Sequence, residues 1–381
     1  MKKVLIGLTV IMSVLLIAYG SSYAISGQCA NCHTMHAMQN GTWVGDPDIN
    51  KHGYLLLTDC IGCHSEVGTP KNNNGDNSYG APIVLHTTAR TGQGGTQTLA
   101  GGDFYWVKIG SSNDAKGHNV SGISGQDSSI GPNLTYTPPG WDPTATSGGA
   151  FGAVAAGAAN WGTTQLTCAG TYGCHGKHTE TDPMLGIHGA HHNNKDGTHT
   201  AANSTTTATG GATTPEIEHA VGGSYRFLGG IYGLENTDWN YNETTSYHNE
   251  YYGINGNASY SDRTTISYSC AECHGIFHSV IGSASPWLRH PTDVDLPDSG
   301  EYSAYKSYNL VAPIARTGPP TTVSDSVTAG TGIVMCLSCH RAHGSDQPDL
   351  LRWDYSTMIA GGGVKTPAGC FACHTQKYQT P

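Results

Sequence analysis

The residues best suited to chemistry are twelve cysteines in six pairs, each pair followed directly by a histidine. In five pairs two residues separate the cysteines, which is the Cys-x-x-Cys-His pattern of covalent c-type haem attachment. Each thiol bonds to one porphyrin vinyl group, and the adjacent imidazole takes one axial position on the iron. The cysteines of these five pairs are Cys29, Cys32, Cys60, Cys63, Cys270, Cys273, Cys336, Cys339, Cys370 and Cys373.

The sixth pair, Cys168 and Cys174, has five residues between the cysteines. A longer loop must still present both thiols to fixed vinyl positions, and Gly170 and Gly173 would let the backbone bulge there. The alternative is a disulfide that His175 follows by chance. We predict attachment at all six pairs, and therefore six haem c groups. The proximal iron ligands would be His33, His64, His175, His274, His340 and His374.

Disulfides and zinc sites are the competing interpretations of paired cysteines in an exported chain. Neither requires a histidine after the second cysteine. With 20 histidines in 381 residues, six such histidines by chance have odds of roughly one in 10⁷ to 10⁸, and no cysteine is left over. Haem attachment is therefore the favoured interpretation.

Each iron with one histidine needs a second axial ligand or keeps an open face. Six of the 20 histidines serve as proximal ligands and fourteen remain, so we predict bis-histidine coordination throughout. A methionine ligand is the alternative at one iron, although packing is the better interpretation of the methionines. The distal candidates are His36, His86, His118, His192, His290 and His343, with His178, His191 and His278 in reserve.

His36 lies three residues after His33 in "CANCHTMH". A residue so close to the proximal ligand cannot readily reach the opposite face of the same porphyrin. His36 is therefore either a surface histidine or the ligand of a different iron. The same reasoning applies to His178, His278 and His343. His52, His199, His219 and His248 lie in polar loops, where a role other than iron ligation is favoured.

The elements that position these residues are predicted to be short. Hydrophobic residues make up 37% of the chain and glycines number 52, so a protein-only core would be small. We predict a mostly irregular chain with short helices and few short strands, organised around stacked haems. A strand is predicted in 101–110, weak strands or turns in 225–234 and 264–268, a loop in 199–214, and helical turns in 37–39 and 350–360.

The domain organisation predicted is a signal peptide over residues 1–24 and a single hexahaem cytochrome c domain over 25–381. Lys2 and Lys3 precede an apolar run that is short for a membrane span, and small residues follow. Without these two lysines the balance is 16 basic against 28 acidic residues, a net charge of −12. Nucleic acid is therefore excluded as the expected partner.

Several strings resemble the OmcS-type extracellular multihaem cytochromes, which polymerise into nanowires. They are "CANCHTMH", "GGDFYWVK", "KGHNV", "YRFLGG", "LRHP" and "CLSCHRAH". The resemblance implies that His36 binds an iron of the adjacent subunit, the one whose proximal ligand is His340. The expanded third motif and "GIHGAHH" depart from that pattern. We place one distal ligand in "GIHGAHH", at His192 ahead of His191.

Saturated bis-histidine irons favour outer-sphere electron transfer along a haem chain rather than enzymatic catalysis. We expect a conduit at the cell surface or outside the cell, built from copies of this chain arranged head to tail. Its other partners would be redox proteins or extracellular acceptors, with direct reduction of metal oxides left open. The alternatives are a monomeric periplasmic shuttle and, less favoured, a multihaem reductase with one open iron.

Overall fold

Irregular backbone dominates the structure, as the composition predicts. The computed structural model describes residues 33, 38–39, 42–43, 56, 58–67, 83–91, 98–131, 136–142, 161–176, 178, 180–187, 228, 230–234, 243–256, 262–279, 290–361 and 368–377. Within them no α-helix exceeds six residues and no strand exceeds three. The predicted signal segment 1–24, the predicted loop 199–214, and Cys29, Cys32, His36, His191 and His192 lie outside the described residues.

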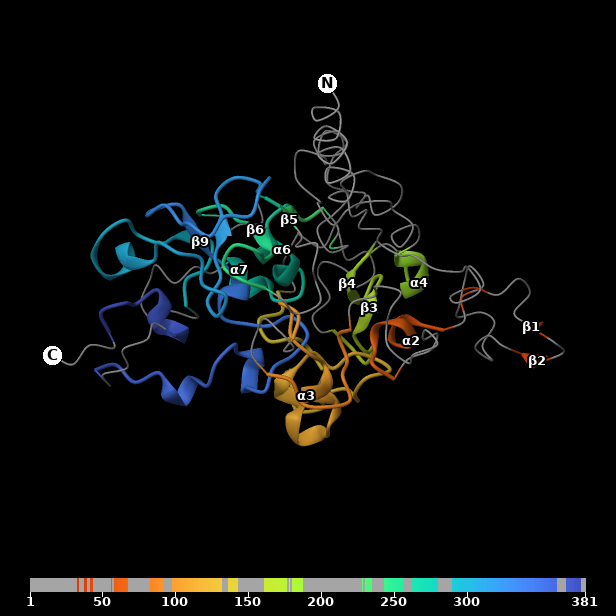
Figure 1. Ribbon diagram of the computed structural model, residues 1–381. Coiled ribbons are helices and arrows are strands. Elements are labelled where there is room, and N and C mark those ends of the chain that lie inside the picture. The colour runs from red at the N-terminus through yellow and green to blue at the C-terminus, as the bar shows by residue number, and fades with distance from the viewer. Residues whose placement is uncertain are drawn as a thin grey trace, which may run out of the picture.

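A five-stranded mixed sheet is the largest regular element (Figure 1). Its strands are β5 (Gly233–Leu234), β6 (Glu250–Tyr252), β7 (Val294–Asp295), β8 (Ala315–Arg316) and β9 (Gly332–Val334), in the order β5-β6-β8-β9-β7. Only β6 and β8 run parallel; the other neighbours are antiparallel. All residues of β6 and β9 are buried. The predicted strand or turn in 225–234 is confirmed by β5.

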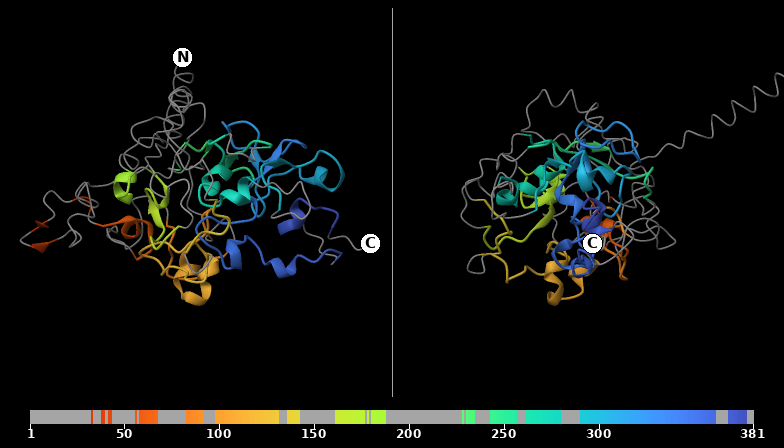
Figure 2. Two further views of the ribbon diagram at one scale, coloured as in Figure 1. Left: turned by 180° about the vertical axis from the view of Figure 1, so that it is seen from behind. Right: turned by 90° about the vertical axis from the view of Figure 1, so that its left-hand side faces the viewer.

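The hairpin of β1 (Met38–Gln39) and β2 (Thr42–Trp43) corrects the helical turn expected at 37–39. Met38 pairs with Trp43, and Asn-Gly lies between the strands in the sequence. Asn-Gly is the strongest short hairpin signal, and it outweighs the helical propensity of Ala37 and Met38. The hairpin stands away from the rest of the described chain, at the opposite end from the C-terminus (Figures 1 and 2).

The described residues form five short α-helices: α2 (Cys60–His64), α3 (Tyr105–Lys108), α4 (Pro183–Gly186), α6 (Ile266–Ala271) and α7 (Gly275–Ser279). Of these, α2, α6 and α7 carry or adjoin a motif. The strand predicted in 101–110 is wrong, since α3 occupies that region. The Asp103 carboxylate accepts a hydrogen bond from the Tyr105 amide at 2.8 Å and so starts a helical turn. The strand or turn expected over 264–268 holds only at its start: Thr264 lies in a turn, whereas the residues from Ile266 onward form α6, which the Thr265 side chain caps.

Short 3₁₀ turns complete the regular structure: η3 (Ser111–Lys116), η6 (Gly300–Ala304), η7 (Cys336–Ser338), η8 (Pro348–Leu350), η9 (Tyr355–Thr357) and η10 (Gly369–Ala372). Within 350–360, where a helical turn is expected, the structure has the short 3₁₀ turn η9. There the Asp354 side chain accepts from the Ser356 amide, while Leu351 instead pairs with His340 in a β-bridge.

The described residues bury their apolar side chains in four separate clusters, the largest with eight buried residues. Three motif cysteines pack against these clusters: Cys373, Cys168 and Cys273. Met335 is a packing residue, since it is fully buried within the sheet cluster. No helix in the described ranges is both long and apolar enough to cross a membrane.

Candidate haem sites

A helical turn holds each regular motif that the structure describes in full. In three of them the histidine amide donates to the carbonyl of the first cysteine, over 2.9 to 3.1 Å: His274 to Cys270, His340 to Cys336 and His374 to Cys370. Cysteines three residues apart on such a turn lie on one face, so both thiols can meet one flat ring. In the remaining one, the helix that begins at Cys60 is capped by Asp59, whose carboxylate accepts from the Gly62 amide at 3.0 Å.

In the expanded motif, two paired strands instead of a helical turn bring the two cysteines together. β3 (Thr167–Ala169) runs parallel to β4 (Gly173–His175), with Thr167 opposite Gly173 and Ala169 opposite His175. Cys168 and Cys174 therefore occupy neighbouring positions on the paired strands. Gly170 has φ +81°, and a Cβ there would lie 2.7 Å from the Glu180 carbonyl oxygen. Gly170 thus adopts a backbone conformation that favours glycine, whereas Gly173, the other glycine expected to allow a bulge, lies within β4.

Thiols of successive motifs lie beside one another. The Cys168 thiol raises the pKa of the Cys60 thiol, with burial as the second cause. The Cys336 thiol does the same to the pKa of Cys270. Burial raises the pKa of Cys373 to about 12, with Cys339 adding to the shift. The contact with Cys60 lowers the pKa of Cys168 in turn. What these pairs share is that the thiols of two different motifs are neighbours.

Three proximal histidines face three of the predicted distal histidines. Ring centres are 6.4 Å apart for His175 and His343, 6.2 Å for His118 and His274, and 6.0 Å for His290 and His374. A metal lies about 2.0 Å from an imidazole nitrogen, and the ring centre roughly 1.1 Å further, so two rings on one iron are roughly 6 Å apart. These three spacings fit an iron between the rings.

In several proximal and distal candidates, the ring nitrogen Nδ1 is hydrogen-bonded to a backbone carbonyl. Nδ1 donates to a backbone carbonyl at 2.6 Å in His118 (Ala342), 2.6 Å in His274 (Pro139) and 2.7 Å in His340 (Asp349). His290 makes the same kind of bond to Pro291 at 2.9 Å. A proton held on Nδ1 leaves the lone pair on Nε2, the arrangement typical of metal-bound histidine.

Burial also lowers the pKa of two of the histidine rings that form these pairs. It lowers the pKa of His274 to about 4 and that of His343 to about 3, with neighbouring imidazoles His118 and His175 respectively adding to the effect. A neutral imidazole is the form that binds a metal. The donor set and its protonation state therefore fit haem c, which would supply an iron that changes oxidation state.

His86 is buried and its Nδ1 contacts the Asp103 carboxylate, itself only 1% exposed. The other Asp103 oxygen accepts from the backbone amides of His86 and Tyr105, at 3.2 and 2.8 Å. A carboxylate behind an imidazole is a recurrent arrangement in metal sites. Asp103 has no motif to reveal it, because it lies 17 residues from His86.

The reserve residues His178 and His278 are buried beside carboxylates. His178 Nδ1 is 3.5 Å from Glu272 Oε2, and His278 Nδ1 is 3.1 Å from Asp293 Oδ2. His248 is buried as well, with Nδ1 3.1 Å from the Thr244 carbonyl and Nε2 3.3 Å from Glu250. It stacks on Tyr308 with ring centres 3.6 Å apart, which is a packing role.

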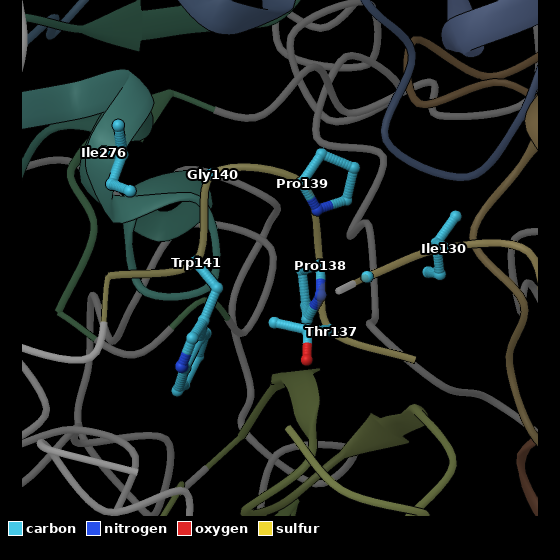
Figure 3. Close-up of a pocket in the computed structure, with 8 residues that line it drawn as sticks. Ile130, Thr137, Pro138, Pro139, Gly140, Trp141 and Ile276 are labelled. Atoms are coloured by element: carbon cyan, nitrogen blue, oxygen red, sulfur yellow. The ribbon is translucent and has the colours of Figure 1, made fainter. Parts of the chain in front are cut away.

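An apolar cavity of about 330 Å³ borders the turn that carries His274 (Figure 3). Ile276 of α7 faces the segment Pro138–Trp141 across it, and the Pro139 carbonyl is the acceptor for His274 Nδ1. These walls suit a flat apolar group beside the ring.

Comparison with known proteins supports haem c binding. Residues 327–379 match the family profile described as the doubled CXXCH motif. C-type cytochrome OmcS of Geobacter sulfurreducens is 26% identical over 422 residues, which cover 95% of this chain and 88% of that protein. The chain is similar to OmcS-type cytochromes. The resemblance predicted from its strings is thereby confirmed, and haem c binding is supported by both matches.

Two solved OmcS-like structures were also matched. The outer membrane cytochrome S filament from Geobacter sulfurreducens is 22% identical, with a TM-score of 0.45, over 88% of this chain and 85% of that chain. The OmcS nanowires from the same organism are 20% identical, with a TM-score of 0.43, over 94% and 92% of the two chains.

Proposed function

We propose that this chain is an extracellular electron conduit that carries electrons along six bis-histidine c-type haems. The observation that carries the proposal is the set of three imidazole pairs at 6.0 to 6.4 Å, the separation expected across one iron. With both faces capped, small substrates do not reach the metal. Outer-sphere electron transfer is then the remaining chemistry, and the protein sets spacing and potential.

The proposed ligand pairs are His175 with His343, His274 with His118, and His374 with His290. The irons of His33 and His64 take His86 and His192. His86 is supported by the Asp103 carboxylate behind its Nδ1. This arrangement uses all six distal candidates of the sequence, with His36 left for the iron of His340.

The order of the haems follows the thiol contacts. Cys60 lies beside Cys168, Cys270 beside Cys336, and Cys339 near Cys373. Burial raises the pKa of Cys273, and the neighbouring Cys174 thiol adds to the shift. Motifs two to six are thus successive neighbours, which supports one continuous chain of haems rather than separate sites.

The chain continues between molecules through His36, which we propose binds the iron of His340 in the next copy. His340 is exposed, and no described histidine ring faces it at the spacing of the other pairs. The hairpin that follows His36 stands out from one end (Figures 1 and 2). A contact that joins different faces of successive copies does not close, so it builds a filament. The resemblance of "CANCHTMH" and "CLSCHRAH" to the OmcS-type cytochromes implies the same assembly.

The test combines mass, spectroscopy and imaging of the purified native protein. Intact mass should show six haems, ferric spectra should be entirely low-spin, and filaments should be visible. His36→Ala should leave the haem load unchanged and abolish filaments. Single molecules under all conditions would instead support the periplasmic shuttle, and a substantial high-spin fraction would support a reductase.

A further inference from the structure

The partners of Nδ1 divide the ligand histidines into two kinds. His118, His274 and His340 donate to backbone carbonyls, which are neutral. His374 and the distal candidate His86 differ, because a carboxylate lies beside Nδ1 in each: Oε1 of Glu301, 3.3 Å away, for His374, and Asp103 for His86. A charged acceptor polarises the imidazole more strongly than a neutral one. Among the proximal histidines with a described Nδ1 partner, His374 is therefore the one whose partner is charged.

Glu301 is held in place for this contact. It lies in η6, and its backbone carbonyl accepts a hydrogen bond from the hydroxyl of Thr375, the residue directly after His374. Its side chain is only 12% exposed. Within the described part of the chain, Oε2 is buried and has no hydrogen-bond partner. The nearest cation is Lys377 Nζ, 3.7 Å from Oε1 on a side chain that is 60% exposed.

We propose that Glu301 lowers the reduction potential of the iron bound by His374, an inference that rests on the proposed function. By accepting the Nδ1 proton in a hydrogen bond, the carboxylate gives the imidazole more anionic character. The imidazole then donates more strongly through Nε2 and stabilises the ferric state. One electron is added on reduction, no bond forms or breaks, and the proton stays on Nδ1. Glu301 is thus a positioning residue that sets the potential at the C-terminal end of the chain.

The axial ring planes provide a way to single out this iron. The planes of His290 and His374 are 84° apart, whereas those of His118 with His274 and His175 with His343 are 47° and 44° apart. Perpendicular imidazoles leave two iron d orbitals nearly equal in energy, which makes the ferric EPR signal strongly anisotropic. The His374 site should therefore be distinguishable from those two sites.

The experiment is an EPR-monitored redox titration of the full-length haem-loaded protein. Glu301→Gln should shift the equilibrium of the strongly anisotropic signal toward the reduced form by roughly tenfold, about 59 mV upward for a one-electron couple. Asp325→Asn is the matched control, since it removes an exposed carboxylate with no contact to a ligand histidine. Lys377→Met should give a smaller shift in the opposite direction, because the carboxylate loses its nearby cation.

An E301Q shift no larger than that of D325N would overturn the proposal. If the E301Q variant no longer gives the anisotropic signal, the K377M variant serves as the test. An unchanged reduction potential in K377M would then overturn the proposal. Failure of the proposed function is a separate outcome, since it would show as fewer than six haems by intact mass or as high-spin iron in the unmodified protein.

Discussion

His118→Ala should open one iron and leave the others closed. His118 faces His274 with ring centres 6.2 Å apart, and its Nδ1 donates to Ala342, 224 residues away. The substitution removes the distal imidazole and one neutral hydrogen bond, which costs about 1 kcal/mol. With the six covalent attachments that we propose, the fold should survive this loss. The iron of His274 then has five ligands.

The expected signal is carbon monoxide binding to roughly one sixth of the ferrous haem, since one of six irons becomes accessible. The ferric variant should show a matching high-spin fraction. Added imidazole should enter the vacated space and restore the low-spin spectrum. The unmodified protein should bind almost no carbon monoxide. If the H118A variant stays fully low-spin and does not bind carbon monoxide, the assignment of His118 to the iron of His274 is refuted.

His248→Ala is the matched control, because it also removes a buried imidazole. His248 packs on Tyr308 and meets Glu250 and the Thr244 carbonyl. We expect a loss of stability on the order of 2 kcal/mol and no new carbon monoxide binding. Equal carbon monoxide binding by both variants would mean that general loosening, and not a lost ligand, opens the iron.

Three further predictions test other parts of the chain. Gly170→Ala should be destabilising by about 1–2 kcal/mol, since residue 170 has φ +81°, and mass spectrometry should show a species with one haem fewer. Glu250→Gln breaks the buried pair with Arg316, whose Nε donates to Oε2 at 2.6 Å; chemical denaturation should show a loss of about 3–5 kcal/mol with unchanged haem spectra. Burial lowers the pKa of His178 from 6.5 to about 4, so its unfolded form takes up a proton first. Stability should fall by up to about 3 kcal/mol as pH drops from 6.5 to 4, and His178→Gln should remove that part of the pH dependence. An iron-bound His178 would show no such effect.

The attachment chemistry could be predicted from the sequence because it is local. Two thiols and an imidazole within five residues are sufficient to specify a haem motif. For the expanded pair Cys168 and Cys174, attachment stays a prediction that rests on the histidine that follows it. The low hydrophobic content also predicted an irregular chain. Short elements were less predictable: α3 begins where the Asp103 side chain captures the Tyr105 amide, a choice that strand propensity in "FYWV" did not reveal.

Only the tertiary structure shows which distant histidines lie close together. His118 meets His274 and His175 meets His343 across separations of more than 150 residues, with no periodicity to mark the pairs. The groups behind the ligands, such as Asp103 and Glu301, were equally invisible in the sequence. Covalent attachment needs only neighbours along the chain. The environment of an iron depends instead on which neutral and charged groups folding places within a few ångströms of its ligands.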